Sequence, residues 1–190
     1  QEFAGLVARL NEKIPQEPMV DFYEELLRRH EIPAHGYKII FDYLLNNVRD
    51  QRLPNIFHAI LSQAPINDKN ARIVLHTLFQ EAEEWVIEGV LFLTLTDNKI
   101  SQERHLNIFN TAISMIYSVI LNESIFARLL KSRQAVRYLY VPMLDSIKYH
   151  SPLKFPRILS EVLLDLNWDY RREYLAIMRR FVHEAAGTAE

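Results

Sequence analysis

The chain repeats its apolar positions at an offset of 34 residues. The stretch from Phe22 to Leu45 reads FYEELLRRHEIPAHGYKIIFDYLL, and the stretch from Ile56 to Phe79 reads IFHAILSQAPINDKNARIVLHTLF. Eleven apolar positions coincide when one stretch is laid on the other, where about seven would coincide by chance. A period of this length is typical of stacked helical hairpins, in which each hairpin covers the apolar face of its neighbour.

The same apolar pattern continues into a third stretch of the chain. The corresponding places a further 34 residues on are occupied by Ile100, Ile108, Phe109, Ala112 and Ile113. The second helix of each hairpin is predicted to start at residues 34, 68, 102, 133 and 168, in steps of 34, 34, 31 and 35. The spacing predicts an α-solenoid-like array, and an irregular helical bundle is the alternative.

Helical periodicity dominates the whole chain and predicts an all-α fold of about eleven antiparallel helices, in a single domain over residues 1–190. The helices are expected at residues 2–13, 18–30, 34–48, 54–63, 68–82, 84–95, 102–121, 123–131, 133–149, 155–166 and 168–186. Pro33 follows the end of the second helix, and Pro142 should kink or split the helix over 133–149. Residues 90–96 have a β-like composition, but a lone strand would have nothing to pair with, so we predict a buried helix there.

Composition restricts both the chemistry and the compartment. The 190 residues include no cysteine, which excludes disulfides, thiolate metal sites and a cysteine nucleophile. The first residues lack the basic start of a secretory signal, and the most apolar run, Trp85 to Leu95, is too short to span a bilayer. We expect an intracellular protein, cytoplasmic or nuclear, without membrane contact. The abrupt helical start predicts a domain excised from a larger protein.

The sequence predicts neither an enzyme nor a cofactor or metal site. It has no Gly-x-Ser-x-Gly elbow, no glycine-rich phosphate loop and no His-Glu-x-x-His motif. None of the seven histidines follows a glutamate by three residues, as the helical ligands of di-iron bundles do. Glu81, Glu84 and Glu88 would share one face of a continuous helix, and a solvated acidic face explains them better than a cation site.

Charge is unevenly distributed along the chain, although the formal net charge is only −2. Residues 81–123 hold seven acidic and two basic side chains, a net charge of −5. Residues 128–157 hold seven basic side chains and one acidic one, a net charge of +6. This basic segment is the candidate partner-binding site, and its residues are Arg128, Lys131, Arg133, Arg137, Tyr138, Tyr140, Lys148, Lys154 and Arg157.

Three interpretations of the basic segment are open. Its cations can hold an acidic protein partner, with tyrosines as anchors. They can also contact phosphates while bases stack on the aromatic rings, although an isoelectric point near 6.4 does not support strong nucleic-acid binding. The third interpretation is that the basic side chains are solvated helix faces and the tyrosines pack inward.

The last predicted helix, over residues 168–186, is amphipathic. Tyr174, Ile177 and Phe181 are predicted to supply its apolar face, together with Tyr170 and Met178. Its charged residues Arg172, Glu173 and Arg179 are expected to point mostly outward. This helix could close the array of hairpins or form an interface.

The run FYEELLRRHEIPAHGY, followed by KIIFDYLL, resembles the tetratricopeptide and pentatricopeptide class of helical repeats, in which a short Ile-Pro turn joins two helices. The resemblance covers residues 20–120 and, more loosely, 123–186. In the pentatricopeptide class a small polar residue near the start of a helix reads an RNA base. The nearest positions here hold Lys38, Arg72 and Leu106, which argues against base-specific reading.

Taken together, these patterns predict a non-enzymatic scaffold or adaptor that binds a peptide or a helical partner within a larger assembly, since helical repeats present extended concave surfaces. An RNA-binding helical repeat is one alternative. A homo-oligomeric assembly module is another, in which residues 81–123 of one copy meet residues 128–157 of a second.

Overall fold

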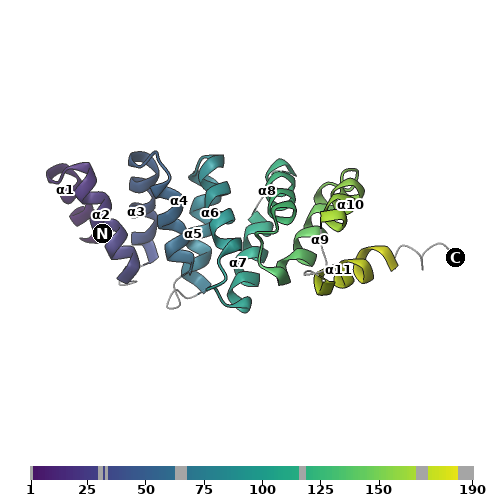
Figure 1. Ribbon diagram of the computed structural model, residues 1–190. Coiled ribbons are helices and arrows are strands. Elements are labelled where there is room, and N and C mark those ends of the chain that lie inside the picture. The colour runs from purple at the N-terminus through teal and green to yellow at the C-terminus, as the bar shows by residue number, and fades with distance from the viewer. Residues whose placement is uncertain are drawn as a thin grey trace. The chain divides into compact units, whose positions relative to one another are not determined.

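A computed structural model describes residues 2–29, 32, 34–62, 68–115, 119–165 and 171–183 of the chain. These residues form eleven α-helices and two shorter helical segments, and they contain no β-strand (Figure 1). The predicted all-α class is therefore confirmed. The chain divides into two compact units, Gln1–Thr94 with Asn107–Met115 and Leu95–Leu106 with Ile116–Glu190, which we call unit 1 and unit 2.

Unit 1 is built from the first six helices and the second half of the seventh. The helices are α1 (Glu2–Lys13), α2 (Gln16–Arg29), α3 (Ala34–Asn47), α4 (Arg52–Ser62), α5 (Asp68–Glu81), α6 (Glu84–Thr96) and α7 (Gln102–Met115). Helix α2 packs against both α3 and α4, and α5 packs against both α3 and α4. The hairpin of α2 and α3 therefore contacts the hairpin of α4 and α5 through both of its helices.

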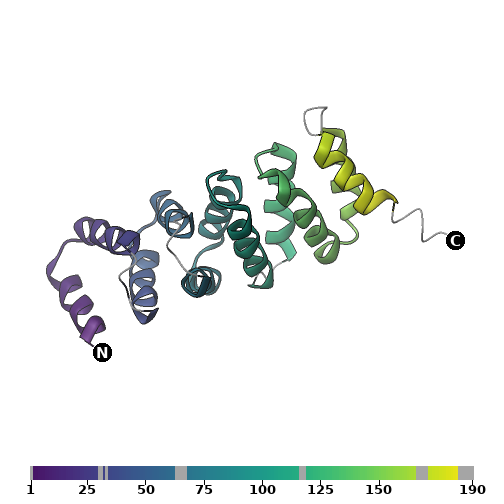
Figure 2. The same ribbon diagram turned by 90° about the horizontal axis from the view of Figure 1, so that it is seen from below.

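Unit 2 contains the start of α7 and the helices that follow it. They are α8 (Val119–Ser132), the 3-10 segment η1 (Arg137–Leu139), α9 (Tyr140–His150), α10 (Phe155–Asp165), α11 (Arg171–Ile177) and the π-helical segment η3 (Met178–His183). Helix α8 packs against α9 and α10, which lie beside it in both ribbon views, and α9 also packs against α11 (Figure 2). The prediction of one domain over residues 1–190 stays a prediction.

The apolar positions that coincide at offset 34 form the core of unit 1. Five pairs of these positions are at most 1% exposed: Tyr23 with Phe57, Leu27 with Leu61, Ile40 with Val74, Phe41 with Leu75, and Leu44 with Leu78. The rings of Phe41 and Phe57 lie with their centroids 5.0 Å apart. Phe22 departs from the pattern, because it is 42% exposed while its counterpart Ile56 is 2% exposed.

Helix α6 occupies the segment whose composition resembles a strand. It runs without interruption from Glu84 to Thr96, so the prediction of a buried helix over residues 90–96 is confirmed. Val90, Leu91 and Leu95 are at most 1% exposed. Across the described part of the chain, no helix combines the length and the apolar character needed to cross a membrane.

Helices α4 and α6 approach each other closely at a glycine. A β-carbon added to Gly89 would lie 2.9 Å from both Cβ and Cγ of Pro54. Real β-carbons do not come this close to carbon atoms, so only glycine fits at this point of α6 without a shift of one helix.

Two predicted helix boundaries are wrong. The predicted break at Asn122 does not exist, because α8 runs continuously from Val119 to Ser132. Residues 116–118, between α7 and α8, lie outside the described residues. The predicted helix over 133–149 begins later, as η1 at Arg137 and then as α9 at Tyr140. Pro142 therefore stands in the first turn of α9, where its missing N–H costs nothing, and it neither kinks nor splits the helix.

The corrected boundary changes one step of the helix spacing. Segment η1 starts at Arg137, 35 residues after the start of α7 at Gln102, where the sequence predicts a step of 31. The predicted start at residue 168 lies outside the described residues. Arg133, directly after α8, has the left-handed conformation with φ = 56°, and the chain turns for four residues before the next helical segment. The solenoid-like repeat itself stays a prediction.

Candidate functional site

The nine predicted partner-binding residues all lie in unit 2, but on several different elements. Arg128 and Lys131 are on α8, Arg133 is in the turn after it, and Arg137 and Tyr138 are in η1; Tyr140 and Lys148 are on α9, Lys154 precedes α10, and Arg157 is on α10. They form three local groups.

The first group lies where α8 packs against α10. Lys131 forms an ion pair with Glu161, and Arg157 Nε lies 3.7 Å from the same carboxylate. The hydrogen bond from Lys131 lowers the pKa of Glu161. Arg128, one turn before Lys131, is exposed. Glu161 therefore neutralises part of the positive charge that the sequence assigns to this segment.

The second group lies around the end of α9. Lys148 Nζ is 5.7 Å from the centroid of the Phe181 ring, a distance suited to a cation–π contact. Lys154 is exposed in the turn that follows α9, and Arg133 is half-buried in the left-handed turn that follows α8.

The third group lines a cavity of about 450 Å³ in unit 2. Arg137, Tyr138 and Tyr140 line it from η1 and α9; Gln102, Val141, Arg172, Glu173 and Ala176 complete the lining. The Tyr138 hydroxyl contacts Nδ1 of His105, which is fully buried, and burial raises the pKa of Tyr138. Tyr140 is only 1% exposed, so it forms part of the cavity wall and cannot serve as a protruding anchor.

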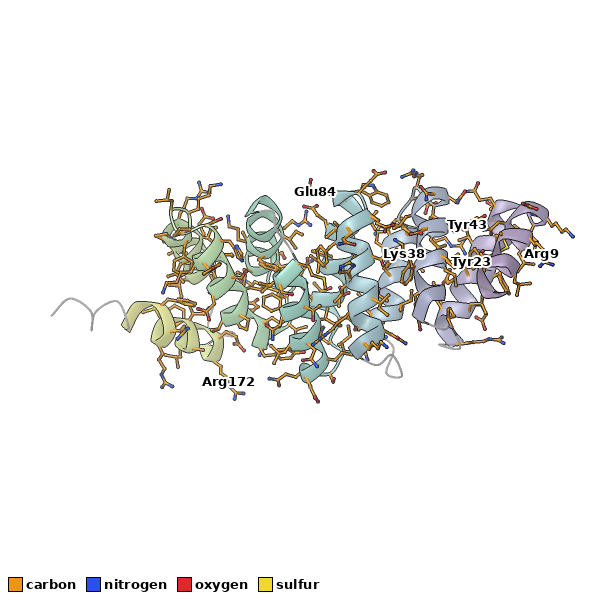
Figure 3. All side chains as sticks on the ribbon, turned by 180° about the vertical axis from the view of Figure 1, so that it is seen from behind. Arg9, Tyr23, Lys38, Tyr43, Glu84 and Arg172 are labelled. Atoms are coloured by element: carbon orange, nitrogen blue, oxygen red, sulfur yellow. The ribbon has the colours of Figure 1, made fainter. Side chains whose placement is uncertain are left out.

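Glu173 is the largest departure from the predicted side-chain pattern. The sequence predicts that it points outward, but it is only 9% exposed. Its neighbour Arg172 is exposed and extends away from the α11 ribbon (Figure 3). The α11 face with Glu173 and Ile177, four residues apart, is turned inward, because α11 packs against α9 through that face. The burial of Glu173 places a carboxylate in the wall of the cavity.

Unit 1 contains a second concave site, which the sequence did not single out. It is a cavity of about 670 Å³, which we call the basic groove, and its lining residues are Lys38, Lys69, Arg72, Ile73, His76, Thr77 and Met115. Five of these residues are on α5 at helical spacing i, i+3, i+4, i+7 and i+8, so they share one face. Lys69, Arg72 and His76 are exposed, whereas Ile73 and Met115 are half-buried and supply an apolar floor.

A charged cluster borders the basic groove on the side of α3. Lys38 forms an ion pair with Glu81, and its Nζ lies 3.8 Å from Oδ1 of Asp42. Burial and the neighbouring Glu81 raise the pKa of Asp42, while the bond from Lys38 lowers the pKa of Glu81. Lys69 and Arg72 form no ion pair with any described residue. These two cations are therefore the ones available to a ligand.

The raised pKa of Asp42 makes a prediction about stability. Ionised Asp42 is disfavoured in the folded protein, so stability should fall as pH rises from the ordinary aspartate pKa of 3.8 through the raised pKa. Asp42→Asn keeps a hydrogen-bond donor toward Glu81 but removes the charge. Because the side chain is 41% exposed, the expected gain at pH 7 is only about 0.5 kcal/mol. Urea denaturation of both proteins at pH 7 and below 3.8 should show the gain only at pH 7.

The basic groove could have been found from the sequence through two of its residues. Lys38 and Arg72 occupy the positions nearest to the base-reading positions of the repeat class that the sequence resembles, and the structure places both at one cavity. Two cations at equivalent positions of successive hairpins disfavour base-specific reading, but they also indicate a site for an anionic group. Lys69 and His76 lie on the same helical face as Arg72, and this spacing indicates a basic surface on α5.

No group of three or more histidine or acidic side chains among the described residues could hold a metal ion. Glu81 ends α5 and Glu84 begins α6, so the continuous helix that would align Glu81, Glu84 and Glu88 does not form. Comparison with known proteins found no matching family model, no matching curated protein and no matching solved structure.

Proposed function

We propose that the chain is a non-enzymatic interaction scaffold and that its basic groove binds an acidic segment of a protein partner. The observation that carries this proposal is the lining of the groove. Lys38, Lys69, Arg72 and His76 supply basic groups, and no carboxylate is among the lining residues that the structure describes. Such a site complements a segment in which acidic residues flank an apolar side chain, because the apolar side chain can pack on Ile73 and Met115.

The groove suits a peptide better than single-stranded RNA. Proteins that bind single strands without sequence preference combine cations with aromatic rings on which the bases stack. Of the described lining residues of the basic groove, only His76 has an aromatic ring, and Ile73 and Met115 give the groove an apolar floor. An apolar peptide side chain fits this floor, whereas the bases of a single strand would have one exposed imidazole on which to stack.

The test is the binding of a fluorescein-labelled 12-residue peptide of Glu, Asp and Leu, followed by fluorescence anisotropy. Lys69→Glu and Arg72→Glu should each weaken binding about tenfold, since each removes an attractive charge and adds a repulsive one. Arg9→Glu, at an exposed position on α1, makes the same change in net charge and should leave binding unchanged. Binding should also weaken as salt is raised.

Two results would overturn this function. One is equal binding of the peptide by the wild type and by the double variant Lys69→Glu, Arg72→Glu. The other is a random single-stranded RNA that binds more tightly than the peptide at low salt, where phosphate contacts are strongest. The second result would favour an RNA-binding helical repeat.

A further inference from the structure

The cavity of unit 2 contains a buried carboxylate that lacks a hydrogen-bond partner. Glu173 is 9% exposed, and its Oε2 atom is buried with no hydrogen-bond partner among the described residues. A buried acceptor without a donor is costly, and for a charged group the cost is larger. Unless function requires it, such a group is rarely kept in the wall of a cavity.

The other lining residues indicate what would complete the site. Arg137 and Arg172 are exposed and can hold an anion at the entrance. Tyr138 and Tyr140 contribute aromatic rings, which attract cations through their faces. The cavity therefore offers a carboxylate and two rings to a cation, and two guanidinium groups to an anion. A cavity of about 450 Å³ lies in the range of small-molecule sites.

We propose that this cavity binds a small zwitterion of the amino-acid class, with its ammonium group on Glu173 and its carboxylate on Arg137 and Arg172. An ammonium group in the cavity supplies a donor to the carboxylate of Glu173, and a charge-assisted hydrogen bond of this kind is about twice as strong as a neutral one. A purely anionic ligand would leave Glu173 unsatisfied, and a purely cationic ligand would be repelled by both arginines. A ligand with both charges can pair with Glu173 and with the two arginines at once.

The experiment titrates each standard L-amino acid into the full chain by isothermal titration calorimetry. At least one should bind at a concentration of about 10 mM or below. Its N-acetyl derivative lacks the ammonium group and its amide lacks the carboxylate, so each should bind about tenfold more weakly than the parent. Binding of the N-acetyl derivative as tight as that of the parent would overturn the proposal, because the arginines alone would then hold the ligand. Failure of every amino acid to bind would overturn it as well.

Two variants locate the site. Glu173→Gln keeps the shape of the side chain and should weaken amino-acid binding about tenfold, while the fold without ligand should be as stable as before or more so. Glu84→Gln, at an exposed position in unit 1, is the matched control and should change nothing. Unchanged affinity in Glu173→Gln would contradict the assignment.

If Glu173→Gln did not fold, Arg172→Ala would decide the question, since Arg172 is exposed and forms no ion pair with a described residue. It should weaken binding several-fold, and unchanged affinity would overturn the proposal. Neither variant touches the basic groove, so the peptide assay of the proposed function should give the wild-type result in both.

Discussion

Gly89→Ala should lower the free energy of unfolding by up to about 2 kcal/mol, although alanine is the better helix former. The added methyl group would lie 2.9 Å from two carbons of Pro54. The proline ring is held by the backbone of α4 and cannot swing aside as a long side chain can. One helix must therefore move, and overpacking of this kind costs about 1 to 3 kcal/mol, against a gain of about 1 kcal/mol in helix propensity. Urea denaturation followed by circular dichroism measures the difference.

Gly5→Ala is the matched control for this substitution. Gly5 also lies within a helix, α1, but a β-carbon there would meet nothing within 4 Å. The higher helix propensity of alanine is then the only effect, so Gly5→Ala should be more stable than the wild type by about 0.5 to 1 kcal/mol. If both variants were stabilised to the same extent, the close approach of α4 and α6 would not constrain residue 89.

The second large effect is a loss of stability at alkaline pH that depends on Tyr23. Burial raises the pKa of Tyr23 from 10.0 to about 12, although its hydrogen bond to Asn11 opposes the rise. Below pH 10.0 the hydroxyl is neutral in both states, and its contribution to stability is complete. Between pH 10.0 and about 12 the unfolded chain releases this proton and the folded chain keeps it, so stability falls by up to about 2.7 kcal/mol.

Tyr23→Phe isolates this contribution, because the other tyrosines titrate in both proteins. At pH 7 the variant should be less stable by about 1 kcal/mol, since it loses the 2.7 Å hydrogen bond from the hydroxyl to Oδ1 of Asn11. From pH 10 upward the two stability curves should converge and then cross. Parallel curves up to pH 12 would show that Tyr23 titrates normally. Figure 3 shows Tyr23 beside Tyr43, whose ring lies 5.0 Å away between centroids.

Much of the fold could be predicted because its signal is local. The burial of Leu27, Ile40 and Leu44 follows from periodicity alone, since a residue on the apolar face of a helix has only one direction in which to pack. The positions at which helices end were harder to predict. Asn122 has the composition of a helix cap but lies within α8, and the turn after α8 depends on Arg133, a residue type that rarely adopts a left-handed conformation.

The candidate sites could be predicted only in part, because they depend on which helix faces meet. Arg137, Tyr138 and Tyr140 were singled out for their charge and aromatic character, and they do line one cavity. The sequence pattern does not predict Glu173 in that cavity, because a charged residue on an amphipathic helix is normally exposed. Its burial follows from the packing of α11 on α9, which sequence periodicity does not define.

Arg133 has two features that a partner could recognise: its positive charge and the left-handed shape of its backbone. Substitutions at this position can test the two features separately. A φ of 56° strains any residue with a β-carbon, and glycine relieves that strain. Arg133→Gly would therefore remove the cation and ease the backbone at once, whereas Arg133→Glu would reverse the charge and keep the strain. A partner that recognises the guanidinium would be lost from both variants. A partner that recognises only the shape of the turn would still bind Arg133→Gly.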